Sequence, residues 1–99
     1  MDCKVILSPR AIQDLSEIVR YIAIDNPTAA ERFGYALIDT AMSLEHLPER
    51  GRLVLEFDDG ITREIIYPPY RIVYRFDAER KLVMVSRFWH AARGTPPRG

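Results

Sequence analysis

The chain has 99 residues, of which 47% are hydrophobic and 28% are charged, and its formal net charge at pH 7 is zero. This length and composition predict one globular domain with a single core, and they argue against several domains or a disordered chain. The single cysteine excludes an internal disulfide bond, and with only two histidines beside it the nitrogen and sulfur ligands of a structural zinc site are missing. We therefore expect no metal and no cofactor.

The sequence shows no sign of a membrane segment. No stretch approaches the roughly 18 consecutive apolar residues that a membrane span needs. The N-terminal stretch MDCKVILSPR has three apolar residues in a row, too few for the core of a signal peptide. We expect a cytoplasmic protein that has no membrane partner.

Positive and negative charges are segregated along the chain. Residues 1–62 carry six Lys or Arg against eleven Asp or Glu, whereas residues 63–99 carry eight against three. A cationic C-terminal half can bind an acidic partner or a phosphate backbone. The alternative is that both sets of charges are solvated faces of the fold.

The first predicted elements are a short strand and a helical hairpin. Residues 3–7 (CKVIL) are apolar and β-branched, which is typical of a strand. Ser8 followed by Pro9 is typical of a helix N-terminus, and Asn26 with Pro27 repeats the signal. Apolar residues recur at helical spacing after each signal, so we expect two antiparallel helices joined by a short turn. These apolar stripes are Ile12, Leu15, Ile18, Val19 and Ile22, then Ala30, Phe33, Leu37, Ala41 and Leu44.

The second half of the chain changes to a period of two. Residues 49–60 are predicted to form a loop that carries at most a short strand. Residues 62–67, 70–76 and 82–90 are rich in β-branched and aromatic residues, and their short separations suit hairpins. The order β, α, α, β, β, β predicts an α+β fold: a βααβββ two-layer sandwich of an antiparallel sheet on the helical hairpin, with the first strand at an edge or in the centre.

Strand alternation predicts which side chains share a face of the sheet. In the middle strand of the meander, one face carries Tyr70, Ile72, Tyr74 and Phe76, and the other carries Arg71, Val73 and Arg75. In the last strand, Met84, Phe88 and His90 share one face, and Val83, Val85 and Trp89 share the other. If the face with the two valines and the tryptophan turns away from the helices, it forms an apolar patch that a partner protein or a second copy would cover.

Five stretches of the sequence carry a resemblance to a known family: LSPRAIQDLSEIVRYI, NPTAAERF, LPERGR, TREIIYPPYRIVYRF and RFWHAAR. With the order of elements, they resemble the RelE/ParE superfamily of bacterial toxins from type II toxin–antitoxin systems, and more closely its ParE-like, plasmid-stabilisation branch. The resemblance covers residues 5–93, and we expect residues 1–93 to form a single toxin domain with residues 94–99 as a flexible tail. Its most specific part is Arg63 with Glu64, then YRIVYR, then a strand ending in His90 with Arg93 three residues later.

The resemblance implies a toxin that a cognate antitoxin neutralises. ParE-like members trap DNA gyrase without any hydrolysis of their own, whereas RelE-like members cut messenger RNA in the ribosome. We expect a gyrase inhibitor, with the ribosome-dependent mRNA endonuclease and a non-toxic binding module as alternatives. Both a homodimer and a toxin–antitoxin hetero-oligomer fit this family.

His90 is the candidate catalytic residue if the protein is a ribonuclease. RNA cleavage needs a base for the 2′-hydroxyl, an acid for the leaving oxygen and cations on the phosphate. His90 is the one side chain in the cationic half that titrates near neutrality. The alternative is that His90 caps the strand end with a hydrogen bond to the backbone. No tyrosine, lysine, histidine or carboxylate follows it, and Ala91 stands where the family has glycine, which favours a binding inhibitor.

Six further side chains are predicted to bind the target or the antitoxin. Guanidinium groups match the geometry of phosphate and carboxylate and stay charged. The alternative is that these arginines pair with Glu64, Asp77 or Glu79 on the strand surface, where such pairs stabilise little. The six residues are Arg63, Arg71, Arg75, Arg87, Trp89 and Arg93.

Overall fold

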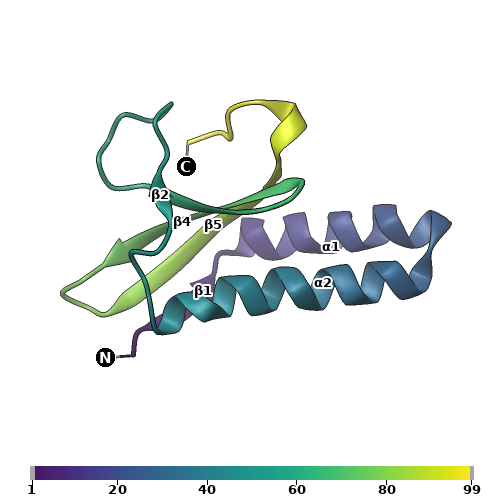
Figure 1. Cartoon of the computed structure of the whole chain (residues 1–99), viewed down its shortest axis with the longest axis horizontal. Helices are drawn as coiled ribbons and strands as arrows, with labels where there is room; N and C mark the ends of the chain where they lie inside the picture. Colours follow the sequence, from purple (N-terminus) through teal and green to yellow (C-terminus); the bar gives the residue numbers. More distant parts are fainter. Residues whose placement is uncertain (1, 99) are drawn as a thin grey trace.

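The computed structural model describes residues 2–98, so the predicted ends of the domain at Met1 and of the tail at Gly99 lie outside the described residues. The two helices lie side by side and antiparallel along one face of the sheet (Figure 1). Among the described residues, no helix is both long and apolar enough to cross a membrane. The elements are β1 (Lys4–Leu7), α1 (Pro9–Asp25), α2 (Pro27–Met42), the 3-10 turn η1 (Ser43–Glu45), β2 (Arg52–Leu53), β3 (Arg63–Tyr67), β4 (Tyr70–Asp77), β5 (Leu82–His90) and the 3-10 turn η2 (Ala91–Arg93).

The sheet has five strands in the order β1-β5-β4-β3-β2. Strands β3, β4 and β5 form the predicted antiparallel meander, and β2 is the short strand expected within residues 49–60. The first strand takes the edge position, where it pairs with β5 in parallel. The α+β two-layer architecture is therefore confirmed, with a mixed rather than a purely antiparallel sheet.

Both helices begin at the predicted caps. The side chain of Ser8 accepts a hydrogen bond from the N–H of Ala11 at 3.0 Å, and Asn26 accepts one from the N–H of Ala29 at 3.0 Å. The N–H of Asn26 also donates to the carbonyl of Ile22 at 3.0 Å, so this one residue ends α1 and begins α2. Each cap contributes about 1 kcal/mol, and the shared cap holds the hairpin tight.

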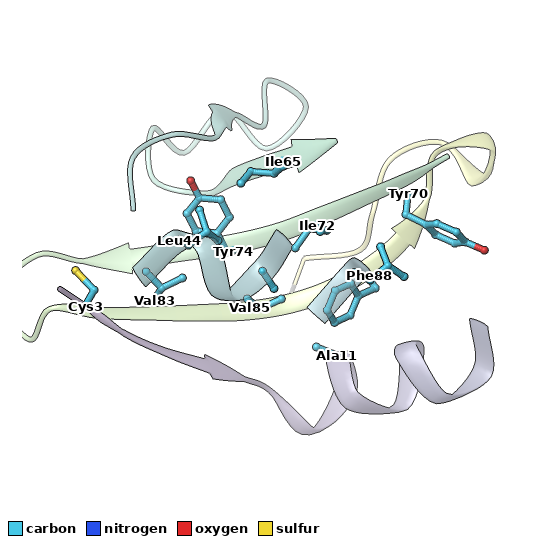
Figure 2. Packing of buried hydrophobic residues seen from close by; sticks show 12 residues of the cluster. Cys3, Ala11, Leu44, Ile65, Tyr70, Ile72, Tyr74, Val83, Val85 and Phe88 are labelled. Carbon is cyan, nitrogen blue, oxygen red and sulfur yellow. The ribbon is translucent and has the colours of Figure 1, made fainter. Parts of the chain in front are cut away.

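The main core lies between the helices and the sheet (Figure 2). The predicted shared face of β4 is confirmed and is the one that meets the helices, because Tyr70, Ile72 and Tyr74 are buried in this core and Phe76 packs against it. Val73 belongs to a separate cluster on the other side of the sheet. We call that side, which faces away from α1 and α2, the outer face.

The predicted faces of β5 are wrong in one half of the strand. Tyr74 pairs with Val85 and Val73 pairs with Arg87, so Ser86 is an extra residue in the ladder. One inserted residue shifts the alternation of side chains beyond it. Val83 and Val85 are therefore fully buried in the main core and do not share the outer face with Trp89, and the predicted apolar patch of these residues does not form.

The outer face is covered by two segments of the chain itself. Val54 and Phe57, from the connection between β2 and β3, pack on Val73 as a second small core. Residues 94–98 return across the same side of the molecule (Figure 1), where Pro96 is buried and Arg98 donates a hydrogen bond to the carbonyl of Phe57. The flexibility expected of residues 94–99 stays a prediction.

Gly51, directly before β2, is expected to tolerate no side chain. Its N–H donates to the hydroxyl of Tyr74 at 2.8 Å, and an added Cβ would lie 2.6 Å from that oxygen and 2.7 Å from the carbonyl oxygen of Glu64. Because that carbonyl belongs to the backbone of β3, the strand would have to move. We expect Gly51→Ala to lower the free energy of unfolding by about 1–3 kcal/mol, measured by urea denaturation.

Gly34 in α2 is the matched control for this substitution. Its added Cβ would meet only a methyl carbon of the Val19 side chain, at 3.0 Å. Alanine also gains about 1 kcal/mol of helix propensity over glycine, which offsets the tight contact. Equal losses of stability in the two variants would contradict the account of Gly51.

Candidate functional site

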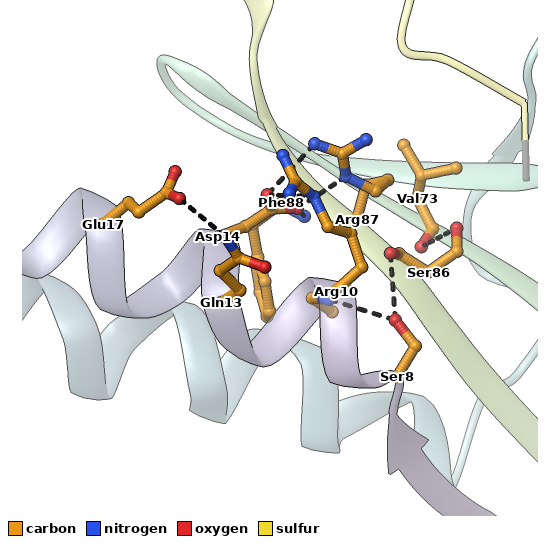
Figure 3. Close-up of polar contacts among 10 residues, drawn as sticks. Ser8, Arg10, Gln13, Asp14, Glu17, Val73, Ser86, Arg87 and Phe88 are labelled. Carbon is orange, nitrogen blue, oxygen red and sulfur yellow. Dashed lines mark hydrogen bonds and ion pairs between the residues drawn. The ribbon is translucent and has the colours of Figure 1, made fainter.

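Arg87 is locked to helix α1 by a buried ion pair (Figure 3). Its Nε and Nη2 atoms donate to the two carboxylate oxygens of Asp14 at 2.7 and 3.0 Å, and both side chains are almost fully buried. Strand β1 pairs with β5 only as far as Val85, and beyond it Asp14 accepts the N–H of Phe88 at 3.1 Å. The carboxylate thus accepts a strand N–H that a neighbouring strand would otherwise bind, and Asp14 was not among the site residues predicted from sequence.

Arg71 is held on the outer face by two carboxylates. Its Nε donates to Glu64, which is almost fully buried, and its Nη1 lies 3.0 Å from a carboxylate oxygen of the half-exposed Glu56. The hydrogen bond from Arg71 holds the pKa of Glu56 below its usual value. Nη1 also donates to the carbonyl of Gly94 at 3.1 Å, so all three nitrogens of the guanidinium group have partners inside the molecule. Pairing with Glu64 was the alternative role predicted for the arginines, but the pair is buried and does not lie on the strand surface.

Trp89 and Arg93 form a stacked pair next to this cluster. The Trp89 Nε1 atom donates to the carbonyl of Gly94 at 3.1 Å, so the indole and Arg71 share one acceptor. The guanidinium carbon of Arg93 lies 3.9 Å from the centre of the indole ring, at cation–π distance. Trp89 is buried, whereas Arg93 is exposed, so the outward side of Arg93 is open to a partner.

His90 ends β5 as a cap. Its Nδ1 atom accepts the N–H of Ala92 at 3.1 Å, and its ring contacts Tyr70 edge-on at 5.2 Å. This is the backbone hydrogen bond that the capping alternative predicted. Because Nδ1 is the acceptor, a neutral ring carries its proton on Nε2. The ring lines a surface cleft of about 380 Å³ together with Asp14, Glu17, Ile18, Tyr21, Tyr70, Phe88 and Arg93.

Arg63 and Arg75 are the remaining predicted arginines. Arg63 donates to the carbonyl of Gly51 at 2.8 Å and keeps about a quarter of its side chain exposed. Arg75 is more than half exposed and lies 3.5 Å from Asp59. Asp59 accepts hydrogen bonds from the N–H groups of Thr62 and Ile61 and from the Thr62 hydroxyl, and these lower its pKa to about 2. Its charge is therefore stabilised mainly by its own loop.

The predicted residues thus divide into two kinds. Arg71 and Arg87 form ion pairs with buried carboxylates. The guanidinium groups of the other three arginines, Arg63, Arg75 and Arg93, are at least partly exposed to solvent. The structure brings Trp89, Arg93 and Arg71 together around Gly94 and leaves Arg75 on another part of the outer face. The groups that hold these side chains in place include the carboxylates of Asp14 and Glu56 and the carbonyl of Gly94.

Comparisons with known proteins agree on one superfamily. The model of the ParE toxin of the type II toxin–antitoxin system parDE matches residues 5–94. Toxin RelE2 of Caulobacter vibrioides is 40% identical over 91 residues, which cover 91% of this chain and 97% of that protein. Toxin RelE1 of the same bacterium is 34% identical over 92 residues, which cover 91% and 95%.

Two solved structures have a similar fold. The toxin–antitoxin complex RelBE2 from Mycobacterium tuberculosis contains a chain that matches with a TM-score of 0.70 at 25% identity, covering 91% of this chain and 99% of that chain. A chain of the chromosomal ParDE toxin–antitoxin system from P. aeruginosa matches with a TM-score of 0.75 at 15% identity, covering 89% and 95%, which is a likeness of fold.

Proposed function

The chain belongs to the ParE toxin family of type II toxin–antitoxin systems, and we propose that within this family it inhibits DNA gyrase by binding, without cleaving a substrate itself. The assignment of a toxin rests on the family and on the related toxins. The choice of gyrase follows from the resemblance to ParE-like toxins and from the internal use of the buried arginines.

The observation that carries the proposal is the pairing of Arg71 and Arg87 with carboxylates. A ribonuclease surface needs cations that can stabilise the charge developing on the phosphate. The Nε and Nη2 atoms of Arg87 both donate to the carboxylate of Asp14. The three guanidinium nitrogens of Arg71 donate to Glu64, Glu56 and the backbone carbonyl of Gly94. These two arginines stabilise the fold, and their positive charges are already neutralised. Such a surface favours protein binding over phosphate chemistry.

We further propose a cognate antitoxin as the neutralising partner in the cytoplasm. Both solved relatives are toxin–antitoxin systems, one of them at 25% identity over nearly the whole chain. Arg63, Arg75 and Arg93 supply exposed guanidinium groups for acidic side chains of such a partner. In this arrangement Trp89 contributes as the support on which Arg93 stacks.

The second candidate is an mRNA endonuclease that acts in the ribosome. Two observations favour it: the curated relatives at 40% and 34% identity carry the name RelE, and His90 lines one cleft with Arg93. In that case His90 would be the acid or the base of the reaction. The cleft also holds Glu17 and Tyr21, but among the described residues His90 makes no hydrogen bond or ion pair with either.

Induction of the protein in a bacterium that lacks the antitoxin separates these candidates. Mapping of RNA 5′ ends within minutes of induction is the measurement. We expect arrested growth with intact messenger RNA. New 5′ ends clustered in translated regions would overturn the gyrase proposal in favour of the endonuclease, and normal growth with folded protein would favour a non-toxic binding module.

His90 is expected to be dispensable for toxicity. His90→Asn keeps a side-chain oxygen that can cap η2 but removes the imidazole that would act as acid or base in RNA cleavage. We expect this variant to arrest growth as the wild-type protein does, and His90→Ala to lose about 1 kcal/mol of stability with toxicity retained. Growth after induction and urea denaturation are the measurements. A folded Asn variant without toxicity would support catalysis by His90.

A further inference from the structure

A pocket on the outer face has no role in the site described above. It has a volume of about 570 Å³, within the range of ligand pockets. Its walls are mostly apolar and come from four separate parts of the chain: Pro9 at the start of α1, Phe57 before β3, Met84 on β5 and Pro97 near the C-terminus. The pocket therefore exists only in the folded protein, with both covering segments in place.

Arg10 lines this pocket and shares its carboxylate partner with another arginine. Its side chain is half exposed, and its Nε lies 3.5 Å from a carboxylate oxygen of Asp14. Asp14, however, already receives both donors of the Arg87 fork and the N–H of Phe88 (Figure 3). One buried carboxylate thus faces two arginines, which leaves a surplus positive charge at the rim of the pocket.

Arg75 lines the same pocket and adds a second positive charge. It lies on β4 and is more than half exposed; its Nε donates to the hydroxyl of Thr62 at 3.3 Å, and its Nη2 lies 3.5 Å from a carboxylate oxygen of Asp59. Asp59 is satisfied by three hydrogen bonds of 2.7–2.9 Å from Ile61 and Thr62. Asp59 and Asp14 lie outside the pocket, and no acidic side chain is among the described residues that line it, so the charged groups that a ligand meets there are the guanidinium groups of Arg10 and Arg75.

The remaining polar groups of the pocket are engaged within the protein. The hydroxyl of Ser8 donates to the carbonyl of Ser86, the hydroxyl of Ser86 donates to the carbonyl of Val73, and the hydroxyl of Thr62 donates to Asp59. A ligand therefore meets apolar walls and two guanidinium groups. Complementary chemistry is an apolar side chain flanked by carboxylates.

We propose that this pocket binds an acidic segment of the antitoxin, with a bulky apolar side chain placed against Phe57 and Met84 and neighbouring Asp or Glu side chains paired with Arg10 and Arg75. The identity of the partner rests on the proposed function. A nucleic acid matches the two charges but offers no apolar side chain for the walls, so an acidic peptide fits the lining better. Because both arginines lie at the rim, they also attract an acidic partner from solution.

The first test uses peptides and does not depend on the antitoxin. The probe is acetyl-Glu-Leu-Glu-amide, and the readout is the methyl resonance of Met84, with the Met42 methyl on α2 as internal reference. We expect Met84 to shift in a saturable manner with this peptide but not with acetyl-Lys-Leu-Lys-amide. The Arg10→Gln/Arg75→Gln variant should bind about five- to tenfold more weakly. No Met84 shift, or an equal shift with the lysine peptide or with a DNA oligonucleotide, would overturn the proposal.

The second test uses the antitoxin encoded beside the gene of this toxin. The double variant Arg20→Gln/Arg32→Gln removes the same charge from exposed sites on α1 and α2 and is the matched control. We expect Arg10→Gln/Arg75→Gln to weaken antitoxin binding more than this control. Equal weakening by both variants would overturn the pocket proposal but leave the proposed function intact. An antitoxin that does not bind the wild-type toxin would count against the proposed function, and the peptide result would then decide on the pocket alone.

Discussion

Replacing Asp14 by alanine should lower the free energy of unfolding by about 3–5 kcal/mol, because it leaves a buried arginine without its partner. Asp14 binds both donors of the Arg87 fork and the N–H of Phe88, at 2.7–3.1 Å. The nearby Arg10 carries the same charge as Arg87 and cannot replace the carboxylate. Urea denaturation followed by circular dichroism measures the loss.

Glu17→Ala is the matched control on the same helix. Glu17 is exposed and its carboxylate accepts one hydrogen bond, from Gln13 at 3.2 Å, so we expect a loss of about 0.5 kcal/mol or less. The double variant Asp14→Leu/Arg87→Met should recover much of the stability, since apolar residues often replace a buried ion pair without loss. A loss below about 1 kcal/mol for Asp14→Ala would mean that Arg87 is not held by this pair.

Glu64→Ala should cost about 3 kcal/mol, several times more than Glu56→Ala. Both carboxylates pair with Arg71, but the side chain of Glu64 is 2% exposed and that of Glu56 is 40% exposed. Glu64 also accepts from Nε of Arg52 at 3.0 Å. Removing Glu64 leaves the buried Arg71 with the half-exposed Glu56 as its one remaining carboxylate and with the carbonyl of Gly94, whereas removing Glu56 deletes a screened pair worth about 1 kcal/mol or less.

This pair of variants tests the structural role given to Arg71. Urea denaturation of each variant in the same buffer gives the two losses directly. Equal and small losses would show that Arg71 does not depend on a buried carboxylate. The charge of Arg71 would then be available to a phosphate, which would favour the mRNA endonuclease over the gyrase inhibitor.

Local signals allowed the helical layer to be predicted from sequence. A helix cap depends only on residues that are close in sequence, because the capping side chain bonds an N–H three residues later. Both predicted caps form, at Ser8 before Pro9 and at Asn26 before Pro27. The extra residue at Ser86 could not be predicted in this way, because it depends on how β5 pairs with β4. The shift it causes places Val83 and Val85 in the main core instead of on the outer face.

The candidate site was predicted only in part, for a similar reason. Asp14 lies three residues after Ala11 and one before Leu15, on the buried side of α1, and a carboxylate within an apolar stripe is a signal for a buried partner. Glu64 gave no such signal, because it is buried by residues that are distant in sequence. The folding of residues 54–57 and 94–98 onto the outer face places Arg71, which was expected at the surface, in a buried ion pair with Glu64.

The measurement that tests the account most directly is a gyrase assay with the purified toxin, released from its antitoxin. Relaxed plasmid, ATP and gyrase are incubated with the wild-type protein and with His90→Asn. The account predicts that both proteins block supercoiling and cause cleaved DNA to accumulate on gyrase. Unchanged supercoiling with a folded wild-type protein that cuts messenger RNA on translating ribosomes would contradict it.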